Sequence, residues 1–297
     1  MNLIRSRDNP FFKELVKLAG SARQRNKTDQ TLLDGAHLLA AYLDSGMMPQ
    51  HILLNASASR DDEITALLKR ANDVPVTQLD DKLFAELSEL KIPTGILALI
   101  EIPQPLHNKV RQSVTSRRLD GIDTGGRRWV PRAADDSTLS QPDTPIAQSR
   151  FALLLEDIQD PGNLGSMLRS AAAAGCDAVF LSQGCADAWS PKVLRAAMGG
   201  HFVLDIYERL DLPGVAKAFS GTLLATSLQA IHSLYDCNLR GNVAFLIGNE
   251  GAGLSDDLLN LATQKISIPM LGKIESLNAA AATAICLFEA VRQRQGL

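Results

Sequence analysis

The sequence predicts an α/β protein with two folded parts, and three observations support this prediction. Apolar runs of strand length alternate with amphipathic helical stretches along most of the 297 residues. Hydrophobic residues make up 45% and charged residues 21% of the chain, which is typical of a globular protein. A segment rich in Pro, Ser, Thr and Gly interrupts the alternation and separates a smaller domain over 1–104 from a domain over 150–297.

The elements expected in the first domain alternate between helix and strand. Two helical regions are predicted first, one in NPFFKELVKLAGSARQR and one in TLLDGAHLLAAYLDSG that ends at Gly46. The strands and helices expected after them are HILLNAS, DDEITALLKRAN, VPVTQL, DDKLFAELSEL and TGILALIEI, in alternating order. This pattern predicts a small α/β sandwich.

The second domain repeats the alternation with more continuous apolar strands. Its predicted elements are FALLLED, NLGSMLRSAAAAG, AVFLS, SPKVLRAAMGG, HFVLDIY, LPGVAKAF, GTLLATSL, NVAFLIG, SDDLLNLA, KISIP and SLNAAAATAICLFEAVRQR. Strands that are apolar throughout and separated by helices indicate a parallel sheet covered on both faces. Ligands of such sheets bind beyond the carboxyl ends of the strands.

The segment 105–149 is predicted to be a flexible basic linker. It contains VRQSVTSRRLDGIDTGGRRWVPR and shows no hydrophobic periodicity. Its arginines, among them Arg127, Arg128 and Arg132, are suited to phosphate contacts, and Trp129 is suited to stacking on a base. A linker with incidental charge explains the same composition.

The formal net charge of −3 conceals two basic blocks. Residues 1–27 hold seven Lys or Arg against two Asp or Glu, and residues 107–132 hold the same numbers. Clustered positive charge is typical of proteins that bind nucleic acid. Helices with a solvated charged face give the same pattern, so both interpretations stay open at this point.

Several classes of protein are disfavoured. No apolar run reaches the roughly 18 residues of a membrane-spanning helix, and MNLIRSRDNP does not resemble a secretory signal, so we expect a cytoplasmic protein with no membrane partner. The four cysteines, Cys176, Cys185, Cys237 and Cys286, lie far apart without a C-x-x-C pair. This spacing predicts reduced, mostly buried thiols and no metal site.

Three loops between predicted strands and helices combine glycine with polar residues: DIQDPGNLGSMLR, IGNEGAGLS and IPMLGKIESLN. Glycine permits close backbone approach to a ligand, and the start of a helix offers free N–H donors. None of the loops has the G-x-G-x-x-G spacing of a dinucleotide-binding fold or the G-K-[S/T] of a P-loop. A Rossmann dehydrogenase is therefore disfavoured.

Together the three loops resemble the motifs of the SpoU/TrmH family of RNA 2′-O-ribose methyltransferases. The motifs are N-x-G-x-x-x-R (Asn163, Gly165, Arg169), G-N-E-G-x-G-L (Gly248 to Leu254) and I-P-M-x-G-x-x-x-S-L-N (Ile268 to Asn278). In the first domain SRDNP, LLDGAHLL and TGILALI resemble the family's substrate-binding domain, a ribosomal-protein-like α/β module. The chain departs from the family at Asn249, where a small hydroxyl residue is frequent, and in the alanines after Asn278.

The resemblance implies a trefoil-knotted parallel-sheet (SPOUT) domain, S-adenosylmethionine as cofactor, no metal, and a homodimer that acts on RNA. Ribosomal RNA is favoured over transfer RNA as the substrate. The alanine-rich final helix is apolar all round in its first half, as expected for a threaded helix buried on every side, although an ordinary core helix gives the same pattern.

Site residues follow from the same resemblance. The expected catalytic positions are Asn163, Arg169, Glu250, Ser276 and Asn278. The expected cofactor-binding positions are Thr226, Leu228, Ile247, Gly248, Gly251, Ile268, Met270 and Leu277. Because a guanidinium stays protonated, Arg169 is expected to anchor phosphate and stabilise a developing alkoxide, not to act as the base. The rival hypothesis is a non-catalytic RNA-binding or ribosome-assembly factor of the same fold.

Overall fold

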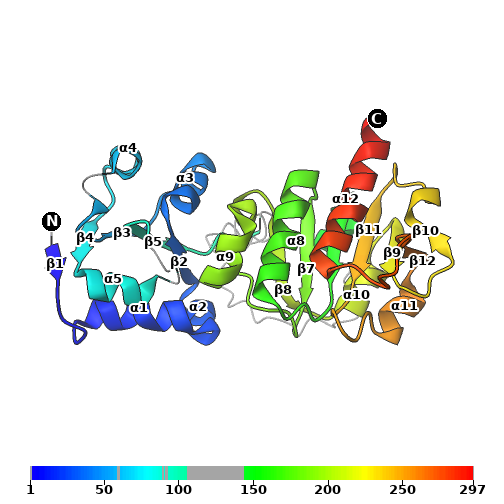
Figure 1. The fold of residues 1–297 in the computed structure, drawn as a ribbon, viewed down its shortest axis with the longest axis horizontal. Helices are drawn as coiled ribbons and strands as arrows, with labels where there is room; N and C mark the ends of the chain where they lie inside the picture. The colour runs from blue at the N-terminus through cyan, green and yellow to red at the C-terminus, as the bar shows by residue number, and fades with distance from the viewer. Residues whose placement is uncertain (1, 59–60, 89, 91–92, 106–143, 297) are drawn as a thin grey trace, which may run out of the picture.

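The computed structural model describes residues 2–58, 61–88, 90, 93–105 and 144–296, and it contains two sheets that lie side by side (Figure 1). Most of the predicted linker 105–149, including Trp129 and its arginines, lies outside the described residues. The end of that segment forms a short helix, α7 (Pro145–Gln148).

The first sheet is mixed and has the strand order β1-β4-β3-β5-β2. β5 runs antiparallel to both of its neighbours, and the other pairings are parallel. Its strands are β1 (Asn2–Ile4), β2 (Gln30–Asp34), β3 (His51–Leu54), β4 (Val76–Leu79) and β5 (Ile96–Glu101). Only β1 and β2 were not expected from the sequence, and β1 is too short to carry a periodic signal.

Helices cover both faces of this sheet, which confirms the predicted α/β sandwich. Leucines and phenylalanines of α1 and α5 pack on one face, and leucines of α3 and α4 pack on the other. The helices are α1 (Pro10–Gly20), α2 (Ala22–Thr28), α3 (Ala36–Asp44), α4 (Asp62–Arg70) and α5 (Asp81–Leu87). α1 and α2 are separate helices because the Ser21 side chain caps the second one, accepting a hydrogen bond from the Gln24 N–H.

The single helix predicted for TLLDGAHLLAAYLDSG was wrong. Its first part is β2, which pairs antiparallel with β5, and only the second part is helical, as α3. Gly35 separates the two with a φ of +112°, a backbone conformation that glycine adopts without strain. Leu32 and Leu33 are both buried, on opposite faces of the sheet, and such a run does not distinguish strand from helix by periodicity.

The second sheet confirms the predicted parallel arrangement. Its order is β10-β12-β9-β11-β6-β7-β8, and every pairing is parallel. The strands are β6 (Phe151–Leu155), β7 (Ala178–Ser182), β8 (Asp205–Leu210), β9 (Thr222–Thr226), β10 (His232–Ser233), β11 (Val243–Ile247) and β12 (Gln264–Ser267). The central strands β6 and β11 are buried along their whole length.

Helices again cover both faces. One face carries α8 (Pro161–Ala174), α9 (Pro191–Ala197) and α12 (Ala279–Gln295), and the other carries α10 (Leu212–Lys217) and α11 (Asp256–Leu261). Two 3₁₀ turns, η3 (Gly200–Phe202) and η4 (Leu234–Asp236), complete the domain. The carboxyl ends of β9, β11 and β12 therefore open toward the start of α12, where the glycine-containing loops lie.

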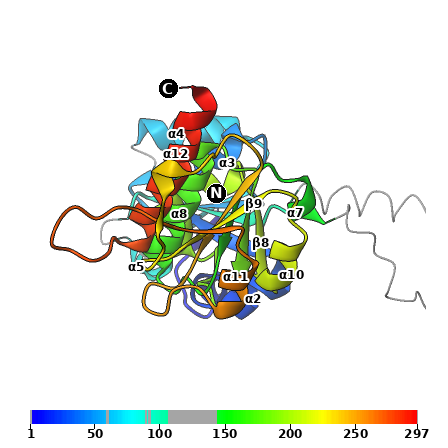
Figure 2. The ribbon, with the colours of Figure 1, turned by 90° about the vertical axis from the view of Figure 1, so that its right-hand side faces the viewer.

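The expectation that α12 is buried on every side was wrong for the single chain. Ala280, Thr283 and Leu287 are buried, whereas Ala281 is exposed and Phe288 is 47% exposed. The segment before the helix, orange-red in Figure 2, stands away from the body, and Leu271 within it is fully exposed. One apolar stripe of α12 is thus exposed to solvent in the single chain.

The trefoil knot stays a prediction. β12 is the second strand from one edge of the sheet. After it, the chain returns through residues 268–278 and places α12 against α8 and β11. In the described part of the chain no helix is long and apolar enough to cross a membrane. All four cysteines are free, and three of them are buried, as expected.

Candidate active site

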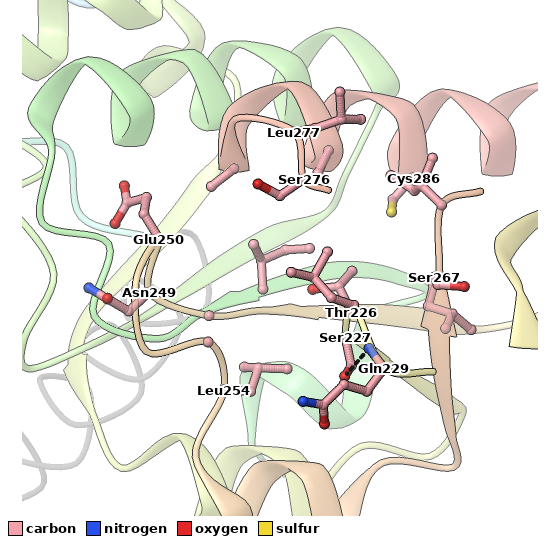
Figure 3. Close-up of a pocket in the computed structure, with 18 of the residues that line it drawn as sticks. Thr226, Ser227, Gln229, Asn249, Glu250, Leu254, Ser267, Ser276, Leu277 and Cys286 are labelled. Atoms are coloured by element: carbon pink, nitrogen blue, oxygen red, sulfur yellow. Dashed lines mark hydrogen bonds between the residues drawn. The ribbon is translucent and has the colours of Figure 1, made fainter. Parts of the chain in front are cut away.

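A cavity of about 660 Å³ lies between the loops that follow β9, β11 and β12 and the first turns of α12 (Figure 3). Its volume falls within the roughly 300–1,000 Å³ of typical small-molecule sites. Its position, beyond the carboxyl ends of parallel strands, is the one expected from the sequence.

The loop after β11 is folded back tightly on itself, and its sequence explains how. Asn249 and Gly253 exchange backbone hydrogen bonds, while the Asn249 Oδ1 accepts the N–H groups of Gly251 and Ala252 at 2.9 and 3.0 Å. A Cβ atom at Gly248 would lie 2.2 Å from the carbonyl carbon of Gly253, so no other residue fits there. Asn249, noted above as a departure from the family, organises this turn.

Asn249 also ties this loop to the one after β6. Its Nδ2 donates to the backbone oxygen of Asp157 at 2.8 Å. Asp157 has a φ of +53°, and its carboxylate accepts the Ser182 hydroxyl at 2.5 Å. Gly184 allows this approach, since a Cβ there would lie 2.2 Å from the Asp157 Oδ1. Sequence reasoning missed these contacts of Asp157, because no spacing of residues indicates an aspartate in the left-handed backbone conformation.

Three of the expected catalytic side chains form one hydrogen-bonded network. The Asn163 Nδ2 donates to the Glu250 Oε1 at 2.8 Å, and the Asn278 Nδ2 donates to the Asn163 Oδ1 at 2.9 Å. Asn163 lies in the first turn of α8, Glu250 in the loop after β11, and Asn278 at the start of α12. Three segments far apart in the sequence thus meet at the edge of the cavity.

The remaining expected catalytic residues lie differently. Ser276 lines the cavity, and Figure 3 shows it above the loop that carries Glu250. Arg169 is exposed on α8, does not line the cavity and makes no hydrogen bond or ion pair with the described part of the chain. The structure therefore gathers Asn163, Glu250, Ser276 and Asn278, and leaves Arg169 on the adjoining surface.

All eight expected cofactor positions line the cavity. They are Thr226, Leu228, Ile247, Gly248, Gly251, Ile268, Met270 and Leu277. The Thr226 hydroxyl is already engaged, donating to the Leu246 carbonyl at 3.1 Å, so this strand end offers mainly backbone groups. Apolar walls with backbone donors and acceptors suit a purine ring, and the glycines allow close approach; the donor set therefore fits S-adenosylmethionine.

Sequence reasoning missed several residues of the cavity wall. Ser227 and Gln229 each directly follow an expected position, and Ser267 directly precedes one. Ala279, Ala282 and Cys286 also line it, at a spacing that places them on one face of α12, and this spacing was readable from the sequence. Burial raises the pKa of the Cys286 thiol to about 12, so it stays protonated and acts as a small apolar group.

Comparison with known proteins agrees with this geometry. Residues 150–288 match the SpoU rRNA Methylase family, and residues 9–98 match the MRM3-like substrate binding domain. An uncharacterized tRNA/rRNA methyltransferase of Synechocystis is 30% identical over 98% of this chain and 94% of its own length. The 23S rRNA (guanosine(2553)-2′-O)-methyltransferase RlmP of Bacillus subtilis is 30% identical over 97% of this chain and 98% of its own.

A solved structure shares the whole architecture. The AdoMet-bound rRNA methyltransferase from Sinorhizobium meliloti is 25% identical, has a TM-score of 0.73, and the match covers 98% of this chain and 97% of that one. The geometry of the cavity and these similarities support the same conclusion. The chain belongs to the SpoU rRNA methylase family of S-adenosylmethionine-dependent RNA 2′-O-ribose methyltransferases.

Proposed function

We propose that this chain methylates the 2′-hydroxyl of one nucleotide in structured ribosomal RNA, with residues 1–104 holding the RNA and residues 150–297 performing the transfer. The observation that carries the proposal is the Asn163, Glu250 and Asn278 network beside a cavity suited to the cofactor. The named relatives support ribosomal RNA as the substrate, because the Bacillus subtilis protein is a 23S rRNA methyltransferase.

The loops after β9, β11 and β12 would hold the cofactor through the eight positions given above. S-adenosylmethionine, when bound, supplies an electrophilic methyl group. The chain's contribution is then to hold the ribose hydroxyl in line with that group and to exclude competing orientations, and such positioning is worth about 7–11 kcal/mol in favourable cases.

The polar residues divide this work. Asn163 holds Glu250 and Asn278 in place, so that the segment carrying Ser276 stays against the cavity. Arg169, exposed and unpaired within the described residues, is free to bind an RNA phosphate and to stabilise negative charge developing on the 2′-oxygen. It does not serve as the base, since its guanidinium stays protonated.

The chain would act as a homodimer in the cytoplasm. Large apolar side chains around α12 and the loops beside it are exposed: Leu228, Ile231, Tyr235, Leu271, Ile274, Leu277 and Phe288. Apolar residues gathered in this way mark a surface for a protein partner, and a second copy of this chain fits because several of them flank the cavity. Phe288→Asp is expected to give a monomer in sedimentation equilibrium, whereas Met48→Asp, at an exposed apolar site in the first domain, should leave the mass unchanged.

The test is transfer of labelled methyl groups from S-adenosylmethionine to ribosomal RNA purified from cells lacking the gene, followed by mapping of the alkali-resistant linkage that a 2′-O-methyl group creates. One methylated nucleotide is expected, with loss of transfer in Arg169→Ala and partial retention in Arg169→Lys. Transfer to transfer RNA alone would identify a tRNA enzyme. Cofactor binding without transfer to either RNA would favour a non-catalytic assembly factor.

A further inference from the structure

Arg25, in the first domain, is buried against the second. It is only 4% exposed, and its Nε and Nη2 both donate to the Asp187 Oδ2, the first at 2.8 Å. Its Nη1 donates to the backbone oxygens of Leu18 and Ala19, the latter at 3.0 Å. Every nitrogen of the guanidinium is therefore committed, one side to α1 and the other to the loop 183–190 between β7 and α9.

That loop is in turn attached to the catalytic side of the sheet. The Ala186 N–H donates to the Ile158 carbonyl at 2.8 Å, in the segment that leads into α8 and Asn163. The other oxygen of Asp187 accepts the Trp189 N–H at 3.0 Å, which fixes the turn. A second contact from the first domain reaches the same turn, because the Thr31 hydroxyl donates to the Trp189 carbonyl at 2.7 Å.

Apolar contacts also join the two domains. The Tyr42 and Phe202 rings pack edge to face with centroids 5.1 Å apart, and Gly199 lies so close to α3 that a Cβ there would be 2.7 Å from the Ala41 Cβ. Apolar packing tolerates small rotations, whereas a guanidinium held through several nitrogens tolerates few. A buried ion pair adds little net stability but requires one orientation.

We propose that Arg25 is a positioning residue that fixes the first domain on the loop 183–190, so that RNA held by that domain reaches the cavity at one set distance. Figure 1 shows α9 and the first sheet's β2 meeting at this boundary. The role of this contact in catalysis rests on the proposed function, but its effect on domain geometry does not.

The first test measures geometry without RNA or cofactor. Nitroxide labels at Ala66→Cys on α4 and Asp257→Cys on α11, both exposed, report the distance between the domains by electron–electron dipolar spectroscopy, with the unsubstituted chain as labelling control. The doubly labelled chain is diluted with an excess of unlabelled chain, so that distances between the two copies of a homodimer do not contribute. One narrow distance distribution is then expected when Arg25 and Asp187 are both present. Arg25→Ala and Asp187→Asn should broaden or shift it, and Arg70→Ala, which removes the exposed Arg70–Asp44 pair, should not. Unchanged distributions in both interface variants would overturn the proposal.

The second test measures catalysis. Arg25→Ala should lower kcat/KM for the ribosomal RNA by about tenfold or more, because misplacement by about 1 Å is enough to do so, and it should leave the dissociation constant of S-adenosylmethionine unchanged. Arg25→Lys preserves the charge and a single donor nitrogen, so it should recover part of the loss. It also provides a folded variant for the comparison if Arg25→Ala is unstable. An unaltered kcat/KM with a broadened distance distribution would refute the role of Arg25 in catalysis. It would still support the role of Arg25 in fixing the first domain on the loop 183–190.

Discussion

At the scale of single residues, Asn163 is the point where three parts of the chain meet. Its amide uses both ends, donating to Glu250 and accepting from Asn278. Asn163→Asp should lower kcat by about 10²-fold, because a carboxylate cannot donate to the Glu250 carboxylate and would repel it. Steady-state kinetics on the ribosomal RNA measures this effect.

Because Asn163 itself does not line the cavity, the loss in kcat should exceed any loss of affinity for the cofactor. Ser166→Ala, at an exposed site one turn further along α8, is the matched control and should retain full activity. Equal kcat values for Asn163→Asp and the native chain would contradict the assigned role.

His201 leads to a prediction about pH and stability. Burial lowers its pKa to about 4 from an ordinary value of 6.5, and its Nε2 donates to the Ala188 carbonyl at 2.7 Å. The unfolded chain therefore binds a proton that the folded chain excludes between these values, so the free energy of unfolding falls as pH decreases from 6.5 toward 4. The loss amounts to about 3 kcal/mol at the lower end.

Urea unfolding of the native chain and of His201→Gln, at pH values from 7 to 4, measures this contribution. Glutamine keeps a donor for the Ala188 carbonyl but does not titrate. The stability difference between the two proteins should shrink or reverse as the pH falls. A constant difference across the range would show that the pKa of His201 is the same in the folded and the unfolded chain.

At the scale of elements, the loop after β11 depends on Gly248. Gly248→Ala should weaken binding of S-adenosylmethionine by about tenfold or more, because the added Cβ would lie 2.2 Å from the Gly253 carbonyl carbon and the turn would have to open. Isothermal titration calorimetry gives the dissociation constant. Gly241→Ala, whose Cβ meets nothing within 4 Å, is the control, and similar affinities in both variants would remove the structural reason for this glycine.

Apart from the two-residue strand β10, the order of elements in the second domain was predictable, because its central strands are continuously apolar and several of its helices carry their own caps. Asp160, Ser190 and Asn278 each cap a helix with a side-chain oxygen. The error at β2 came from an apolar run that fits strand and helix equally well. The exposed stripe on α12 could not be predicted, since composition does not tell a buried face from one that awaits a partner.

The candidate site was predictable where a sequence motif directly follows a predicted strand. Glycine and amide residues at strand ends pointed to the cavity, and Asn163, Glu250 and Asn278 do contact one another. The Asp157–Ser182 bracing and the Arg25–Asp187 pair were not predictable, because each joins positions whose proximity depends on the completed fold. The roles of the individual site residues stay predictions.

At the scale of the whole molecule, one cluster of buried apolar side chains runs through both domains. It includes Leu33, Leu39 and Ile96 of the first and Leu164 and Leu181 of the second. The chain should therefore unfold in one cooperative transition, and calorimetry should give equal calorimetric and van 't Hoff enthalpies.

Phe202→Ala should separate the transition into two, because it removes the ring that packs on Tyr42 at the domain boundary. Val203→Ala, at the neighbouring position with 71% exposure, should preserve the single transition. Two transitions in the native chain would mean that the domains are energetically independent.

Asn278 joins the end of the chain to the reaction. The same side chain caps α12, accepting the N–H groups of Ala280 and Ala281, and donates to Asn163. The polar network is therefore complete only after the last helix has docked. A chain still emerging from the ribosome, or one cut short before that helix, lacks the network, so methyl transfer would report that synthesis and folding of this protein have both finished.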